Sequence, residues 1–187
     1  MNPLPGGDDD TGWFSGTRWI PSPNADGRPI GSRICLIVIH AISLPPNSFG
    51  GPGIIDLFTN QLDPEAHPYY REIKGLRVSS HFLIRRDGAV IQFVSCLQRA
   101  WHAGISQWNG RDQCNDFSIG IELEGCDGLP FEDAQYLALN TLLAEIYRQY
   151  PVEAIVGHSD IAPGRKTDPG PHFDWGRLTS KSHFISK

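Results

Sequence analysis

The feature that most constrains the fold is an unbroken apolar run in the first quarter of the chain. Residues 34–39 are Ile, Cys, Leu, Ile, Val and Ile. A short run of this kind, rich in β-branched residues, is typical of a strand that is buried on both faces. His40 follows the run directly and should end the strand. Because open α/β sheets place chemistry in the crevice outside their strand ends, His40 is a candidate functional residue.

A second constraint lies near the C-terminus, in residues 157–175. Pro and Gly interrupt this segment, which is otherwise rich in His, Asp, Lys and Arg. The composition excludes a long helix or a central strand, so we expect a surface loop. Loops of this length inside a compact domain are usually functional. Its prolines lower the entropy of holding one shape, which suits a loop that fixes polar groups in place.

Between these two segments, hydrophobic periodicity and turn residues predict the remaining regular structure. The predicted elements are a short amphipathic helix at 54–62, a hairpin of 81–86 and 89–94 that turns at Asp87-Gly88, a strand at 118–124, an amphipathic helix at 133–150 and a short strand at 154–156. The last strand leads into Gly157-His158, so a second histidine follows an apolar run.

The strand at 118–124 carries an acidic candidate. Its residues alternate, so Ile119, Ile121 and Leu123 share one face while Ser118, Gly120, Glu122 and Glu124 share the other. Glu122 therefore projects away from the apolar set, with Gly120 beside it to leave room. Glu124 lies at the strand's end and is equally consistent with a solvated or a loop-bonded carboxylate.

The chain has 187 residues, which favours a single domain. Residues 1–32 are rich in Pro, Gly, Asp and Ser, and we expect an N-terminal arm packed on the domain. The domain itself should span 33–176, and residues 177–187 form a polar tail that we expect to be frayed.

Charge and composition exclude several classes of partner. The net charge of -5 gives no electrostatic footprint for nucleic acid. The N-terminus has no basic and apolar leader, and no segment approaches the roughly 20 apolar residues of a membrane span. We therefore expect a cytoplasmic protein without a membrane or nucleic-acid partner. A monomer is expected as well, although no feature of the sequence specifies the oligomeric state.

The four cysteines, at positions 35, 96, 114 and 126, form no Cys-x-x-Cys pair. Their spacing disfavours a thiolate zinc cluster or a redox motif. Cys35 and Cys96 lie in apolar runs and are expected as small core residues. A disulfide between Cys114 and Cys126 is conceivable only in an oxidising compartment.

Three side chains together favour a metal site. His40 and His158 each follow an apolar run, and Asp168 lies ten positions beyond His158 across the Pro/Gly loop. Two imidazoles and a carboxylate match a catalytic zinc site, in which three protein ligands leave a fourth position for water. Each histidine alone is more often a hydrogen-bonded structural residue. The combination with a constrained acidic loop favours the metal.

Amide hydrolysis at such a site also needs a proton shuttle to the leaving amine. Glu122 is the best candidate for that role. Lys166, two residues before Asp168, is close enough in sequence to aim its ammonium at the oxyanion of a tetrahedral intermediate. Without the neighbouring ligand, a solvated surface lysine would be the better interpretation.

These segments also match a known family. Val-Ile-His at 38–40, Ser-Ser-His-Phe-Leu-Ile-Arg-Arg-Asp-Gly at 79–88, Arg-Ala-Trp-His-Ala-Gly at 99–104, the run 115–125, Gly-His-Ser-Asp-Ile-Ala-Pro at 157–163 and Asp-Pro-Gly at 168–170 closely resemble the zinc amidases that share a fold with phage lysozyme-type amidases and peptidoglycan recognition proteins. Within that family, 42–46 and 166–170 are similar to the cytoplasmic branch that acts on anhydro-muropeptides. The resemblance covers about 21–175.

The resemblance implies an α/β single domain with a central mixed β-sheet flanked by helices. It implies zinc (Zn2+) held by His40, His158 and Asp168. It also implies N-acetylmuramoyl-L-alanine amidase activity, with cleavage between the lactyl group of 1,6-anhydro-N-acetylmuramic acid and the L-alanine of the stem peptide during peptidoglycan recycling. The implied partner is therefore an anhydro-muropeptide substrate.

The chain departs from the family pattern at several positions. Phage and recognition-protein relatives carry a cysteine as third ligand and a tyrosine before the hairpin histidine, where this chain has Asp168 and Ser80. The missing tyrosine supports Glu122 as the acid/base group. Ala41 replaces an asparagine that is common after the first ligand, and Gln113 stands where some relatives carry an arginine.

Further residues are candidates for substrate binding. Arg77 could face the peptide carboxylates, although a structural salt bridge explains it equally well. Trp101 and His102 could form a substrate wall, with the aromatic face stacked on a sugar. His81 recurs in the family but is not a metal ligand there.

Two other functions remain open. One is a muropeptide-binding or regulatory module that keeps the groove without turnover. The other is a periplasmic amidase that acts on intact peptidoglycan. Both ligand and acid/base candidates are present in the sequence, which favours the recycling enzyme over the binding module.

Overall fold

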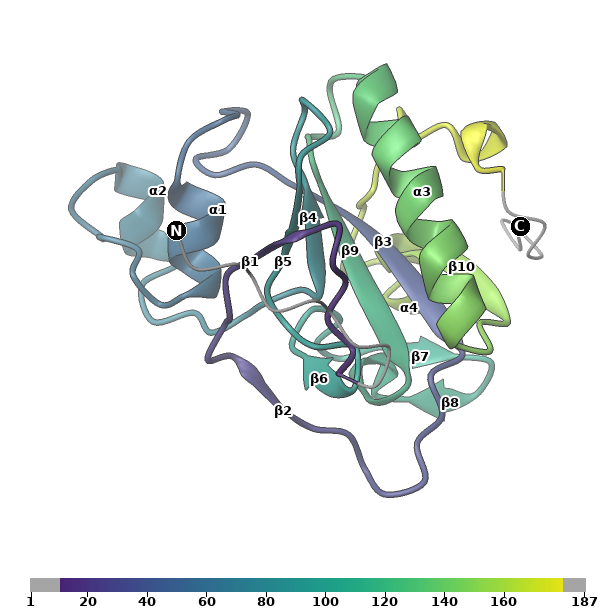
Figure 1. The fold of residues 1–187 in the computed structure, drawn as a ribbon. Coiled ribbons are helices and arrows are strands. Elements are labelled where there is room, and N and C mark those ends of the chain that lie inside the picture. The colour runs from purple at the N-terminus through teal and green to yellow at the C-terminus, as the bar shows by residue number, and fades with distance from the viewer. Residues whose placement is uncertain (1–10, 180–187) are drawn as a thin grey trace, which may run out of the picture.

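A six-stranded mixed sheet lies at the centre of the protein, seen in a computed structural model that describes residues 11–179 (Figure 1). In spatial order its strands are β1 (Arg18–Trp19), β5 (Val90–Gln92), β4 (Phe82–Ile84), β9 (Ser118–Glu124), β3 (Leu36–Ile42) and β10 (Ala154–Gly157). Only β4 and β5 pair antiparallel; the other neighbours in this sheet are parallel.

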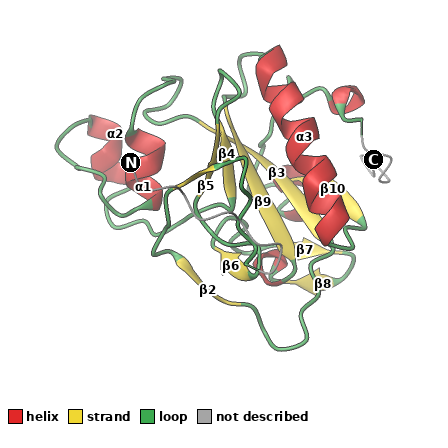
Figure 2. Ribbon diagram, in the orientation of Figure 1, coloured by secondary structure: helices red, strands yellow, loops and turns green. Residues whose placement is uncertain are grey.

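Helices and short ribbons surround the sheet (Figure 2). The helices are α1 (Gly53–Phe58), α2 (Pro68–Glu72), α3 (Asp133–Gln149) and α4 (His158–Ile161), with 3-10 turns at Cys114–Asp116 and Trp175–Arg177. Two antiparallel ribbons pair β2 (Ala25–Gly27) with β6 (Gln98–Ala100), and β7 (Gln107–Trp108) with β8 (Arg111–Asp112).

Alternation along the central strands decides which side chains meet which layer. The long helix α3 lies across one face of the sheet (Figure 1). It packs Leu139 and Leu143 into a core cluster that includes Ile39 and Ile121. Because successive side chains of a strand point to opposite faces, His40 and Glu122 project from the face opposite to α3. The register pairs these two residues across β3 and β9.

The other face is covered in two parts. The short helices α1 and α2 pack against β4 and β5 through a second core cluster, which includes Phe58, Tyr70, Leu83 and Phe93. A third cluster places Val38 and Val156 against Cys114 of the 3-10 turn and Ile161 of α4. The functional face is therefore flanked by short elements and loops, whereas α3 covers the opposite face.

The prediction that β3 ends at His40 is wrong. The strand begins at Leu36 and continues through His40 to Ile42. The physical reason is its pairing, because β9 accompanies β3 over its full length and Ile42 lies opposite Glu124. The residues before and after His40 are thus both paired with β9, which fixes the position of His40 within the strand.

The predicted helix at 54–62 is shorter in the structure. Helix α1 ends at Phe58, where the Thr59 hydroxyl donates back to the Ile55 carbonyl at 2.8 Å. Asn60 then takes a positive φ of 60°, a left-handed conformation that ends a helix.

The predicted hairpin is present as β4 and β5. The Arg85 N–H donates to the Ala89 carbonyl at 2.9 Å, and Gly88 adopts φ 85° while Asp87 does not take a positive φ. A three-residue loop with glycine in the left-handed position is a common hairpin connection.

Two short helices depart from the expected loops. His158 opens the one-turn helix α4, although most of 157–175 is irregular as predicted. Helix α2 was not predicted, and its N-cap is His67. The His67 Nδ1 accepts a hydrogen bond from the Tyr69 N–H at 3.1 Å, and Pro68 occupies the first helical position.

The N-terminal segment takes part in the sheet. Phe14 is buried, β1 extends the sheet edge and β2 pairs with β6. Near the other end, Leu178 is buried and the Asn140 amide donates to the Arg177 carbonyl. The remaining parts of the expected arm and tail, 1–10 and 180–187, lie outside the described residues.

Two further expectations concerned the cysteines and membrane-spanning segments. All four cysteines are free, and Cys96 and Cys114 are fully buried while Cys35 is partly buried. Among the helices of 11–179, none is long and apolar enough to cross a membrane.

Candidate active site

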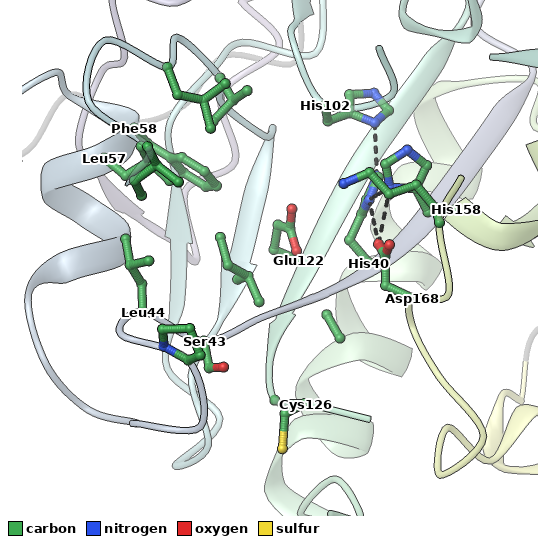
Figure 3. Close-up of a pocket in the computed structure, with 18 of the residues that line it drawn as sticks. His40, Ser43, Leu44, Leu57, Phe58, His102, Glu122, Cys126, His158 and Asp168 are labelled. Carbon is green, nitrogen blue, oxygen red and sulfur yellow. Dashed lines mark hydrogen bonds and ion pairs between the residues drawn. The ribbon is translucent and has the colours of Figure 1, made fainter. Parts of the chain in front are cut away.

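The structure brings His40, His158 and Asp168 together on the face opposite to α3. His40 comes from β3, His158 from the start of α4 and Asp168 from the loop beyond it. The Nδ1 atoms of the two histidines are 3.0 Å apart, and Asp168 Oδ2 lies 3.1 Å from each of them (Figure 3). Residues separated by up to 128 positions thus present three donor atoms to one point.

These three atoms fit a zinc ion. A tetrahedron with metal–ligand bonds of about 2.0–2.1 Å has edges of roughly 3.3–3.4 Å, close to the observed triangle. Two nitrogens and one carboxylate oxygen are also a known donor set of catalytic zinc, with a fourth position left open. Within the part of the chain described, this is the group of His, Cys, Asp and Glu residues that could hold a metal ion.

Electrostatics favours the forms that bind a metal. Burial lowers the pKa of His40 to about 4, so its ring is neutral at neutral pH. Burial alone would raise the pKa of Asp168, but the close contacts of its carboxylate with His158 and His40 outweigh burial and hold that pKa well below its usual value. A neutral imidazole and an ionised carboxylate are the ligand states that zinc requires.

Glu122 lies beside this cluster and has an unmatched oxygen. Its side chain is buried, and its Oε2 has no hydrogen-bond partner among the described residues. Burial raises the pKa of Glu122 well above its usual value, and the charge of Asp168 adds to this. A carboxyl group that holds a proton readily and faces a groove suits general acid/base chemistry.

Lys166 is exposed at the rim of the same groove. Its ammonium makes no hydrogen bond or ion pair with any residue in 11–179, so it is available to a ligand. Burial dominates the pKa of both buried neighbours, lowering that of His40 and raising that of Glu122, and the positive charge of Lys166 lowers each of them by a smaller amount. The ammonium charge of Lys166 therefore affects both the metal cluster and Glu122.

The groove has a volume of about 480 Å³ and two unlike walls. The metal cluster forms one wall, and residues of α1 and its preceding loop form the other, with Glu122 between them (Figure 3). The sequence did not mark this second wall as functional. It is apolar and aromatic: Leu44, Leu57 and Phe58 are joined by Tyr69 of α2 and by Leu76, which follows α2. Leu57 and Phe58 lie on a predicted helix, but periodicity cannot distinguish a groove wall from a core face.

The predicted substrate residues are placed differently from one another. Ala41 and Trp101 line the groove and are partly exposed. His102 also lines it, but both of its ring nitrogens are engaged by the protein, at His40 and Ser118. Arg77 is exposed and lines a separate cavity of about 110 Å³ instead.

Glu124, two residues beyond Glu122, is a loop-bonded carboxylate. It is buried, and its Oε1 accepts from the Arg85 guanidinium and from the Gly50 N–H, both at 2.7 Å. His81 is likewise structural, since its Nδ1 accepts the Gly120 N–H at 3.0 Å.

Comparison with known proteins agrees with this arrangement. A family model described as N-acetylmuramoyl-L-alanine amidase matches residues 31–171. The chain is 56% identical over 169 residues to the 1,6-anhydro-N-acetylmuramyl-L-alanine amidase AmpD of Escherichia coli K12, covering 89% of this chain and 92% of that protein.

Two solved structures are similar. A crystal structure of a selenomethionine AmpD derivative has a TM-score of 0.87 and 55% identity, and the match covers 90% of this chain and 96% of that one. E. coli AmiD in complex with the substrate anhydro-N-acetylmuramic acid-L-Ala-D-gamma-Glu-L-Lys has a TM-score of 0.56 and 34% identity, over 81% of this chain and 59% of that one.

These matches confirm the expected fold, a mixed sheet with flanking helices in one domain. They also confirm that the chain is an amidase of the kind its motifs resemble. The chain belongs to the N-acetylmuramoyl-L-alanine amidase family.

Proposed function

We propose that this protein is a zinc-dependent amidase that releases the stem peptide from 1,6-anhydro-N-acetylmuramyl peptides in peptidoglycan recycling. The bond cleaved joins the lactyl carbonyl of the sugar to the nitrogen of L-alanine. The observation that carries the proposal is the convergence of His40, His158 and Asp168 beside Glu122 and its unpartnered oxygen. Similarity to AmpD over most of the chain supports the substrate.

His40, His158 and Asp168 would hold the ion through Nδ1, Nδ1 and Oδ2. Bound zinc would supply Lewis acidity toward the scissile carbonyl and the attacking water. Glu122 accepts a proton from that water and delivers it to the alanine nitrogen as the C–N bond breaks. The buried setting of Glu122 suits both steps, because a raised pKa brings a carboxyl group closer to the operating pH.

Lys166 and the two walls complete the proposal. The Lys166 ammonium stabilises the negative charge that develops on the carbonyl oxygen. Trp101 and Ala41 contact the substrate at the metal side, and the apolar wall excludes water from the opposite side. The enzyme is proposed to act as a cytoplasmic monomer, which cell fractionation and sedimentation would test.

Mass spectrometry of peptide release from a purified anhydro-muropeptide tests the proposal. The zinc-loaded protein should release the peptide, a chelator should abolish release, and added zinc should restore it. The same protein should act poorly on intact sacculi. Tight binding of the muropeptide without release would instead support a binding module, and preferred cleavage of sacculi would support a periplasmic amidase.

The role of Lys166 is tested in the same assay. Lys166→Met should lower kcat by about 10²–10³-fold, the usual cost of losing one oxyanion donor. Lys74→Met is the matched control, since Lys74 is exposed and does not line the groove. Equal activity of the two variants would remove Lys166 from the mechanism.

A further inference from the structure

The outer nitrogens of the two ligand imidazoles contact adjacent residues. His40 Nε2 lies 2.9 Å from His102 Nδ1, and His158 Nε2 lies 3.1 Å from the Ala103 carbonyl oxygen. Residues 102 and 103 are far in sequence from both ligands. One dipeptide thus contacts both histidines on the side away from the metal position.

At His158 the contact fixes the position of the ring proton. A carbonyl oxygen can only accept a hydrogen bond, so His158 Nε2 must carry the proton. The lone pair of the neutral ring then lies on Nδ1, which faces Asp168 and the proposed ion. The carbonyl of Ala103 therefore selects the tautomer that can bind the metal.

At His40 the same result follows from a longer chain of contacts. The Ser118 hydroxyl donates its one proton to the Cys114 carbonyl at 2.5 Å. Ser118 Oγ can then only accept from His102 Nε2, which is 3.1 Å away. Among the described residues no carboxylate is bonded to His102, so the ring is neutral and its Nδ1 is an acceptor. His40 Nε2 must donate to it, which leaves the lone pair of His40 on Nδ1.

The dipeptide is itself held in place. The Asn115 Oδ1 accepts from the backbone N–H groups of His102 and Ala103, at 3.1 and 2.8 Å. Gly120 lies under the His102 ring, and a Cβ at that position would come within 2.5 Å of the ring carbon Cγ. The glycine therefore makes room for His102, whereas the sequence suggested that it made room for Glu122.

We propose that Ser118 and Asn115, acting through the His102–Ala103 dipeptide, are positioning residues that set the tautomers of both ligand imidazoles and so the affinity for the metal. The inference rests on the proposed zinc function. The opposing force is Asp168, whose carboxylate attracts a proton onto the two Nδ1 atoms that face it. The outer contacts favour the other tautomer and keep both lone pairs free for the ion.

The test measures tautomers in metal-free protein and zinc affinity in parallel. Nitrogen-15 spectra of the imidazoles, taken at pH 8, should show both His40 and His158 protonated on Nε2. Ser118→Ala should shift His40 toward protonation on Nδ1 and leave His158 as it was. Its zinc dissociation constant, measured against a chelating dye, should rise about 10–100-fold, as is typical when a partner of a metal ligand is lost.

Matched variants separate positioning from packing. Ser95→Ala removes another buried serine that donates to a backbone carbonyl; its hydroxyl bonds to Thr11 and Leu97 and to none of the histidines, so neither readout should change. Asn115→Ala should change the tautomers of both His40 and His158. It replaces Ser118→Ala in the test if that variant does not fold. Asn115→Asp keeps an acceptor for the two N–H groups and should restore the tautomers.

A wild-type His40 protonated on Nδ1 would overturn the inference. So would tautomers and zinc affinity that are unchanged in both Ser118→Ala and Asn115→Ala. Because the spectra are recorded without metal, they remain decisive even if the protein hydrolyses no muropeptide, so failure of the proposed function would be seen separately.

Discussion

Strand β9 carries two glutamates, Glu122 in its interior and Glu124 at its end, and their surroundings differ sharply. Both carboxylates are on the same face and both are buried. At the end of the strand, Arg85 and the Gly50 N–H bond to Glu124 and tie the loop before α1 to the hairpin. In the middle, Glu122 keeps an oxygen without a partner in the described chain.

The comparison teaches that burial alone does not identify a functional carboxylate. A buried charge with hydrogen-bonded partners is a structural element, and removing one partner is costly. A buried carboxyl group without such partners lowers the stability of the fold, and active sites are where such groups are commonly found. Substitutions at the two positions should therefore affect different quantities.

The largest expected effect is on activity at Glu122. Glu122→Gln keeps the size of the side chain but removes proton transfer, so kcat should fall about 10²–10⁴-fold. KM should change much less, because the lost interaction belongs to the transition state. Steady-state kinetics on an anhydro-muropeptide measures both. Full activity in this variant would show that Glu122 is not the acid/base group and does not differ from Glu124 in function.

The next effect is on stability at Glu124. Glu124→Gln leaves the Arg85 guanidinium with a neutral partner in a buried setting, and the free energy of unfolding should fall by about 3 kcal/mol. Urea denaturation of the metal-free protein measures this change. If stability is unchanged while kcat drops as far as in the Glu122 variant, Glu124 is not the structural carboxylate.

A smaller effect of opposite sign is expected for the stability of Glu122→Gln. Burial raises the pKa of Glu122 in the folded state above its unfolded value of about 4.3. Below that value both states are protonated and wild type carries no penalty. Between that value and the folded pKa, the carboxyl ionises in the unfolded state but stays protonated in the folded state, so wild type loses stability until pH reaches the folded pKa.

Metal-free Glu122→Gln should therefore be more stable than wild type at pH 8 and equal to it near pH 4. Urea midpoints at the two pH values provide the measurement. A variant that is less stable than wild type at pH 8 would show that Glu122 has stabilising partners in the folded state.

The smallest effect is expected at an exposed carboxylate. Glu153 forms a surface pair with Arg33 at 3.9 Å, with both side chains about two-thirds exposed. Glu153→Gln should change the free energy of unfolding by less than about 0.5 kcal/mol and leave kcat unaltered. A larger change would mean that the assay reports something other than burial and pairing.

Local pattern was enough to predict β9, the hairpin and α3, because alternation, a glycine turn and helical spacing are properties of neighbouring residues. The same local logic identified His40, His158 and Asp168 as candidates that could meet. It placed His40 at the end of β3 because the apolar run ends there, whereas pairing with β9 extends the strand.

Contacts between residues far apart in the chain could not be predicted from local sequence pattern. The role of Glu124 depends on Arg85, 39 positions away, and that of His102 on His40, 62 positions away. The sequence could therefore name Glu124 only as solvated or loop-bonded, and it placed His102 on a substrate wall. Helix α2 was not predicted because it has only five residues, beginning with Pro68, and so short a segment shows no clear hydrophobic periodicity.

The most direct test of the central claim is the number of zinc ions bound per chain after equilibrium dialysis. We predict one zinc for wild type and a loss of tight binding in His40→Ala, His158→Ala and Asp168→Ala, each of which removes one of three ligands. Wild type without bound zinc, or full zinc binding in any of the three variants, would contradict the account.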